Sequence, residues 1–187
     1  DLAGAEKDFP AKDHIEAFQR VLNNNVNITI HAGEAFGAPS IHQALHYCRA
    51  HRIGHGTHLI EDADLMNWVN DHRIPVEVCL ASNLQTKAVP DFQSHPIRKF
   101  MDAGMRVTLN TDNRLVSGTT VTNEFELAVK HYDLDLEDVL SLIMNGFKSA
   151  FLPLKEKSLL IDQVLAEFAS LGARFSGEIS RRRRVHL

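Results

Sequence analysis

Four side chains that could carry out acid-base or metal chemistry follow directly on short apolar runs of the chain: His31, Glu34, His55 and Asp112. Imidazole and carboxylate are suitable ligands for Zn²⁺, and a catalytic zinc keeps one position open for a water whose pKa it lowers to about 7. His31 and Asp112 are therefore the candidate metal ligands. Glu34 lies three residues after a ligand and is a candidate proton donor, while His55 could orient or deprotonate the water.

The elements around these residues alternate, because each short run rich in β-branched residues is followed by a stretch of helical period. The runs predicted as strands are 26–30, 52–54, 74–78 and 105–109. The stretches predicted as helices are 40–50, 62–71, 95–103 and 121–132, followed by two packing helices at 134–151 and 154–171. This alternation predicts a parallel sheet with helices outside it. The carboxyl ends of barrel strands form the mouth where active sites are built, so the four side chains are expected to converge there.

The composition is that of an ordinary globular protein, and residues 1–187 are predicted to form one domain or part of one. The chain is 44% hydrophobic and 24% charged, and it contains no linker rich in glycine, serine or proline. A formal net charge of -4 argues against nucleic acid as a partner and favours a small, weakly charged substrate. The basic stretch 181–184 is interpreted as a solvated chain end.

The sequence predicts a cytoplasmic protein with no membrane anchor. No apolar run approaches the ~18 residues of a membrane span, and no charged-then-apolar leader is visible. Cys48 and Cys79 lie far apart, so neither a disulfide framework nor a thiolate zinc site is predicted. Cys79 stands at a strand end without a histidine beside it in sequence, and it is interpreted as a small buried hydrophobe rather than a nucleophile.

Five phrases of the sequence combine these features in a particular order. They are DLAGAE at 1–6, TIHAGE at 29–34, RIGHG at 52–56, SN at 82–83 and LNTD at 109–112. In this order and spacing they resemble the adenosine deaminase family of metal-dependent hydrolases, over essentially the whole chain. The resemblance implies a (β/α)₈ TIM barrel of which only the second half is present, from the end of strand four through strand eight and the C-terminal helices.

The resemblance implies zinc-dependent deamination of a small purine nucleoside, adenosine or deoxyadenosine, to inosine or deoxyinosine and ammonia. His31 and Asp112 would bind the zinc from the fifth and eighth barrel strands. Glu34 would protonate purine N1, which weakens the ring aromaticity so that the activated water can add at C6, and His55 would help to manage the proton of that water. Gly4 would donate its backbone N–H to purine N3, and its lack of a Cβ would let the ring approach closely.

Two departures from the family pattern have different consequences. Asn113 and Arg114 stand where a second aspartate followed by proline is common. That aspartate must be protonated to donate to purine N7, whereas asparagine donates without a raised pKa, so we expect Asn113 to preserve purine binding and to remove one source of pH dependence. Leu80 and Ala81 stand where proline is usual, and we expect only the local turn to differ.

The resemblance also implies two ligands that this sequence does not contain. The family takes them from a His-x-His pair ending the first strand, and no H-x-H occurs in the 187 residues. Two ligands do not make a tetrahedral site, and a complete barrel needs eight strands and about 250 residues. The chain also starts at Asp1 without an initiator methionine. We therefore expect one zinc per complete barrel, with the N-terminal half in another chain or missing from this sequence.

Other functions remain open at the level of sequence. The substrate could be another 6-aminopurine, such as adenine or a modified adenosine. The chain could instead be a non-catalytic half-barrel partner that lacks the metal strand, or a zinc hydrolase acting on a cyclic amide or ester. A site of the cytidine deaminase type is not favoured, because that type uses H-x-E with P-C-x-x-C, whereas the spacing here is H-x-x-E. Phe36 could line a purine pocket or pack locally.

Overall fold

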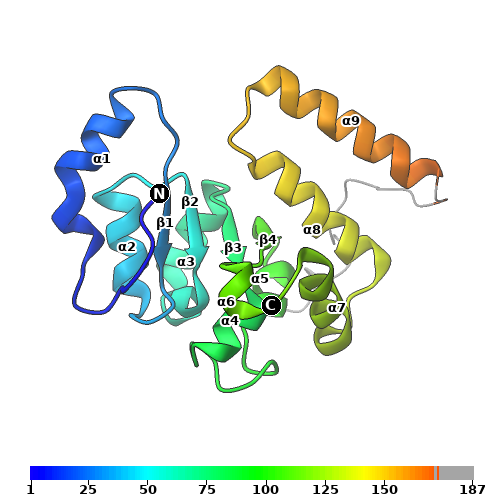
Figure 1. Cartoon of the computed structure of the whole chain (residues 1–187), viewed down its shortest axis with the longest axis horizontal. Coiled ribbons are helices and arrows are strands. Elements are labelled where there is room, and N and C mark those ends of the chain that lie inside the picture. Colours follow the sequence, from blue (N-terminus) through cyan, green and yellow to red (C-terminus); the bar gives the residue numbers. More distant parts are fainter. Residues whose placement is uncertain (171, 173–187) are drawn as a thin grey trace.

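The computed structural model describes residues 1–170 and 172, and its centre is a four-stranded parallel sheet (Figure 1). The strands are β1 (Thr29–Ala32), β2 (Arg52–His55), β3 (Val76–Val78) and β4 (Val107–Leu109). They lie side by side in chain order, and every pairing is parallel. The predicted parallel sheet is confirmed, although β1 is shifted from its predicted run, β2 is one residue longer, and β3 and β4 are two residues shorter.

Helices connect and cover the strands. They are η1 (Ala11–His14), α1 (Ile15–Leu22), α2 (Ala38–His46), η2 (Thr57–Glu61), α3 (Ala63–Asp71), α4 (Leu80–Gln85), α5 (Ile97–Asp102), α6 (Arg114–Ser117), α7 (Val121–Tyr132), α8 (Leu136–Ser149) and α9 (Leu154–Ser170). Every predicted helix is present, α7 with the predicted ends and the others with ends shifted by up to four residues, whereas η1, α1, η2, α4 and α6 were not predicted. The predicted end of the last helix at residue 171 and the basic stretch 181–184 lie outside the described residues.

The sheet has two chemically different faces because side chains alternate along each strand. One face packs against surrounding helices such as α2 and α5, and its central side chains are fully buried: Ile30, Ile53, Val76 and Val107. The other face is polar. There Thr29 Oγ1 donates to Glu77 Oε2 over 2.7 Å, and Arg52 Nε lies 2.8 Å from Glu77 Oε1. In a closed barrel this second face lines the interior.

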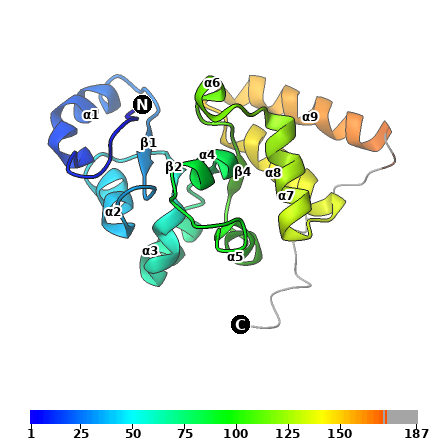
Figure 2. The ribbon, with the colours of Figure 1, turned by 60° about the horizontal axis from the view of Figure 1, so that its bottom comes forward.

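The two edges of the sheet are occupied differently (Figure 2). At the β1 edge the opening segment adds a single parallel bridge, in which Leu2 N donates to Thr29 O and His31 N donates to Leu2 O over 2.9 Å. This confirms the predicted remnant of a preceding strand. At the β4 edge, α8 lies alongside, and Asn145 Nδ2 donates to Val107 O over 3.0 Å. Among the described residues, neither edge of the sheet is therefore paired with a further complete strand.

No helix within residues 1–170 is long and apolar enough to cross a membrane. The last of them, α9, packs against α8 and has no buried residue. It extends away from the sheet in both views (Figures 1 and 2). The sheet and the loops at its carboxyl edge therefore hold the residues of functional interest.

Candidate functional site

The backbone turns sharply where the strands end, and these turns direct the polar side chains. His55 is the last residue of β2 with a φ of 64°, and Asp112 follows β4 with a φ of 54°. This left-handed region costs a non-glycine residue about 1–3 kcal/mol and is typical of functional sites. After β1, Gly33 takes the left-handed conformation, and a Cβ there would collide with Ile41. Glycine is therefore required where the β1 loop passes α2.

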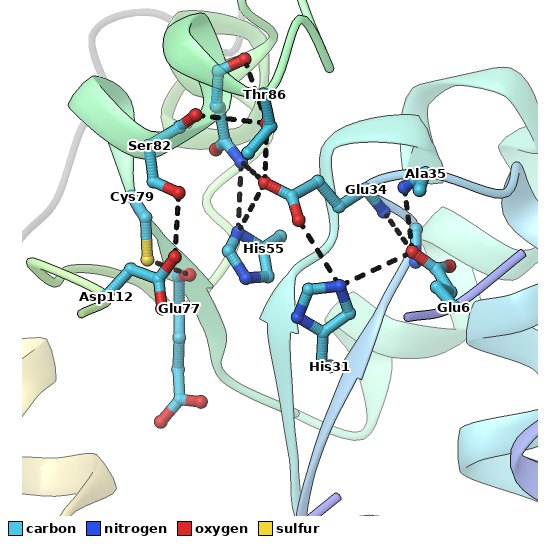
Figure 3. A network of polar contacts seen from close by, with 12 residues as sticks. Glu6, His31, Glu34, Ala35, His55, Glu77, Cys79, Ser82, Thr86 and Asp112 are labelled. Atoms are coloured by element: carbon cyan, nitrogen blue, oxygen red, sulfur yellow. Dashed lines mark hydrogen bonds and ion pairs between the residues drawn. The ribbon is translucent and has the colours of Figure 1, made fainter. Parts of the chain in front are cut away.

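Three of the four predicted side chains form one compact group, drawn in Figure 3. Ligand atoms of His31, Glu34 and His55 all lie within 4.8 Å of one another. His31 Nε2 is 3.3 Å from Glu34 Oε2, and His55 Nδ1 is 3.4 Å from Glu34 Oε1. The two imidazole rings meet edge to face with centroids 4.3 Å apart. The predicted convergence at the carboxyl edge is thus present for these residues.

The Glu34 carboxyl group is buried and is held by one donor from α4 and one from the residue that follows it. Its Oε1 accepts from Asn83 Nδ2 over 3.0 Å and from Thr86 Oγ1 over 2.8 Å. Because Oε1 has these two partners, Oε2 is the oxygen turned toward His31 (Figure 3). Such an arrangement can hold a carboxyl oxygen in place for proton transfer.

His55 is buried beside the same carboxyl group. Its Nδ1 lies 3.0 Å from Asn83 Nδ2. Burial lowers the pKa of His55 below its usual value, and the nearby Glu34 carboxylate opposes that change. The neutral imidazole is therefore the form that this environment favours.

The buried carboxylate of Glu6, which had no predicted role, organises the loop after β1. Glu6 accepts hydrogen bonds from the backbone N–H groups of Gly33, Glu34 and Ala35, the last two over 2.9 and 2.8 Å. Its Oε2 also lies 3.6 Å from His31 Nε2. A carboxylate bound by several backbone N–H groups is a stable arrangement, so Glu6 ties the opening segment to the loop that carries Glu34. Nothing in the local sequence indicates this contact, because the partners lie 27 to 29 residues away.

Asp112 and Asn113 follow β4 and are exposed, in contrast to the group on β1 and β2. Asp112 Oδ2 accepts from Ser82 Oγ over 2.7 Å, and Asp112 is not a member of the compact group. Asn113 begins α6, where its Oδ1 accepts from the N–H groups of Leu115 and Val116. Because the carbonyl oxygen caps the helix, the Nδ2 group is the end of Asn113 that remains to donate to a ligand.

A cavity of about 220 Å³ adjoins His31 on the side of the opening segment, and its lining includes Gly4, Glu6 and Phe9. Gly4 has a φ of 124°, and no atom lies within 4 Å of the position that a Cβ would take. Its backbone is therefore open to a molecule in the cavity. Phe36 is 43% exposed and is not part of this lining.

The remaining candidates behave as the sequence predicted. Cys79 is buried, and burial raises the pKa of its thiol, so it is a small protonated side chain rather than a nucleophile. Five further histidines, on helices or in turns, are exposed or half-buried: His42, His46, His51, His58 and His72. Neither cysteine forms a disulfide.

The residues present provide part of a metal site. His31 offers a half-buried imidazole from β1, at one edge of the sheet. Asp112, which follows β4 at the other edge, offers a carboxylate oriented by Ser82. Imidazole nitrogen and carboxylate oxygen are both suitable for Zn²⁺. The donor set is therefore consistent with zinc and is incomplete within this chain.

Comparison with known sequences agrees with the geometry. The adenosine deaminase family model matches residues 1–167. Adenosine deaminase 1 of Streptomyces coelicolor is 43% identical over 176 residues, which cover 88% of this chain and 44% of the relative. The chain spans about half the length of the curated relatives it matches.

In comparison with solved structures, this chain again covers about half of each protein that it matches. Adenine deaminase from Arthrobacter aurescens matches with a TM-score of 0.85 at 29% identity, over 90% of this chain and 51% of that protein. An amidohydrolase from Burkholderia ambifaria, solved with bound zinc, matches with a TM-score of 0.83 at 21% identity, over 91% of this chain and 48% of that protein, which shows a shared fold. The sheet and its helices are accordingly the second half of a (β/α)₈ barrel, and the chain belongs to the adenosine deaminase family.

Proposed function

We propose that this chain forms the second half of the active site of a zinc-dependent purine deaminase, which converts adenosine or deoxyadenosine to inosine or deoxyinosine and ammonia. The single observation that carries this proposal is the compact group of His31, Glu34 and His55 at the strand ends. It brings a candidate ligand, a carboxyl group and a neutral imidazole to one edge of the sheet. The complete reaction requires the N-terminal half of the barrel.

Glu34 is the proton donor in this proposal. Its Oε1 is anchored by Asn83 and Thr86, so the other oxygen is available to deliver a proton to purine N1. Protonation at N1 reduces the aromatic character of the ring and makes C6 accept a water oxygen. The carboxyl group must carry the proton before the step and gives it up during the step, as general acid catalysis requires.

His31 and Asp112 would hold the zinc together with two ligands from the N-terminal half, one ion per complete barrel. When bound, zinc lowers the pKa of water and supplies the nucleophile at neutral pH. The orientation of Asp112 by Ser82 supports this assignment, as does the bound zinc of the related amidohydrolase fold. His55 faces the same region and would orient the water.

The purine would lie in the cavity beside His31. Gly4 has an open backbone there and would donate its N–H to purine N3. Asn113 would donate Nδ2–H to purine N7 while its carbonyl oxygen caps α6. The alternatives within this chemistry are adenine, which the related Arthrobacter enzyme is named for, and modified adenosines. A non-catalytic half-barrel is the alternative outside it.

The test uses the complete barrel, that is this chain together with the N-terminal half. Zinc content is measured alongside the loss of absorbance of adenosine, with adenine as a second substrate. We expect about one zinc per barrel and turnover of adenosine. Turnover of adenine alone would change the substrate, and absence of zinc and turnover would leave the half-barrel scaffold as the function.

Glu34→Gln tests the assignment of the proton donor. The amide keeps the size and can still accept from Asn83 and Thr86, but it has no acidic proton, so kcat should fall by about 10²–10⁴-fold. Zinc content should remain near one. The control is His42→Gln on the exposed face of α2, which should retain full activity. A Glu34→Gln enzyme as active as the control would contradict the role of Glu34.

A further inference from the structure

We propose that His95 is a positioning residue of this active site, which acts through Asn83 to determine which ring nitrogen of His55 carries the proton and to hold the Glu34 carboxyl group. The catalytic consequence rests on the proposed deaminase function. The hydrogen bonds themselves do not depend on it. His95 stands before α5, and it was not singled out by the sequence.

The hydrogen-bond chain begins at a group whose direction cannot reverse. The backbone N–H of Ile97 donates to His95 Nδ1 over 3.1 Å. A backbone N–H only donates, so Nδ1 must accept and the proton of the neutral ring must be on Nε2. His95 is 4% exposed, and its burial, with His55 nearby, lowers its pKa to about 4. The ring is therefore neutral near pH 7.

The second link is the side-chain amide of Asn83, which is fully buried. His95 Nε2 lies 3.2 Å from Asn83 Oδ1 and donates to it. This contact settles the orientation of the amide, because the reverse orientation would place two donors face to face. The NH₂ group of Asn83 must then point to the other side, where Glu34 Oε1 and His55 Nδ1 each lie 3.0 Å away.

The third link determines the state of His55. An amide NH₂ group only donates, so His55 Nδ1 accepts, and the proton of neutral His55 is on Nε2. The 3.4 Å approach of His55 Nδ1 to Glu34 Oε1 would be an ion pair only if Nδ1 were protonated. We interpret it instead as two acceptors that share the two hydrogens of Asn83. His55 therefore presents an N–H, not a lone pair, at Nε2.

A purely structural role for His95 is the competing interpretation. The ring fills a buried space, its centroid lies 6.4 Å from that of Tyr132, and it accepts at the start of α5. That role predicts changes in stability without changes at His55. The positioning role predicts a change in the protonated nitrogen of His55 and in kcat, because ligand-supporting partners of this kind typically contribute about 10–100-fold.

The experiment compares three variants of the complete barrel. His95→Phe removes the donor and keeps the size, His95→Gln keeps a donor near Nε2, and Asn83→Asp keeps the shape but replaces both amide donors with an acceptor. Two quantities are measured: kcat and KM with adenosine, and the nitrogen-15 chemical shifts of His55, which distinguish protonated from unprotonated ring nitrogens. His72→Phe is the matched control, since the same change is made at an exposed histidine that directly follows α3.

We expect His95→Phe to lower kcat about 10–100-fold with KM changed less than about threefold, and His95→Gln to recover most of that loss. Asn83→Asp should lower kcat at least as much and move the His55 proton to Nδ1. His72→Phe should match the wild type in both measurements. If His95→Phe fails to fold, Asn83→Asp and His95→Gln still test the chain of hydrogen bonds.

Two results would overturn the inference. One is an unchanged His55 spectrum in Asn83→Asp. The other is a His95→Gln enzyme no more active than His95→Phe. If the wild-type barrel deaminates no purine, the proposed function fails, whereas the His55 spectra of the folded variants continue to decide whether His95 and Asn83 fix the tautomer.

Discussion

The polar residues at the ends of β1 and β2 are buried and hydrogen-bonded within this chain, whereas those after β4 are exposed. Glu34 and His55 receive their donors from Asn83, and Glu6 holds the loop beneath them. Among the described residues, Ser82 donates the one side-chain hydrogen bond that Asp112 accepts, and Asn113 caps a four-residue helix. The first region is therefore organised by this half of the barrel, and the second is expected to gain its remaining contacts from the N-terminal half.

The largest expected effect is that of substituting Asp112, which should abolish zinc binding by changing only the region after β4. Asp112→Ala removes a proposed zinc ligand, so the zinc content of the complete barrel should fall from about one to near zero, and turnover should fall with it. The buried Ser82 hydroxyl loses its acceptor, so the free energy of unfolding without metal should fall by about 1–3 kcal/mol. Metal analysis and urea unfolding of the metal-free protein check this, and retention of zinc would exclude Asp112 as a ligand.

Acid should destabilise the fold through His95, which supports the side chains at the ends of β1 and β2 by way of Asn83. His95 has a pKa of about 4 when folded and its ordinary value of 6.5 when unfolded. Above pH 6.5 both states are neutral and the stabilisation is complete. As the pH falls from 6.5 to 4, the unfolded chain binds a proton that the folded chain does not, and stability falls by about 3 kcal/mol.

The measurement is the free energy of unfolding as a function of pH, for wild type and for His95→Phe. The wild type should lose stability over this interval more steeply than the variant. Parallel curves for the two proteins would show that His95 is not held neutral by the fold.

Glu6→Gln should destabilise the loop after β1 without removing a catalytic group. One oxygen that accepts backbone N–H groups is replaced by a donor, so the free energy of unfolding should fall by about 2 kcal/mol. Urea unfolding measures the change. As a control, Glu16→Gln alters an exposed carboxylate on α1 and should change stability by less than about 0.5 kcal/mol. Equal stability of the two variants would contradict the role given to Glu6.

Asn113→Asp should have the smallest effect, confined to the exposed region. The carboxylate still caps α6, so stability should be retained. A carboxyl group donates to purine N7 only when protonated, so KM should rise by about fivefold as the pH passes above the carboxyl pKa. KM measured across that range checks this, and an unchanged pH profile would argue against contact with the purine.

The sequence predicted the parts of the fold that depend on local pattern. Alternating β-branched runs and helical periods identified the four strands and the helices that follow them, because those patterns reflect burial of one face of each element. The positions of His31, His55 and Asp112 at strand ends followed from the same pattern. The short helix α4 was missed because its six residues carry no periodic signal, and with it the partners of Glu34 were missed.

What the sequence by itself determined is the set of chemical groups, their order at the ends of parallel strands and the family. Only the tertiary structure decided that Glu6 would bind the β1 loop and that His95 would reach His55 through Asn83. Those contacts join residues that lie 12 to 29 positions apart in the chain. Hydrogen bonds of this kind depend on the distance and direction of single atoms, and these are defined only once the strands pair and the loops close over the edge of the sheet.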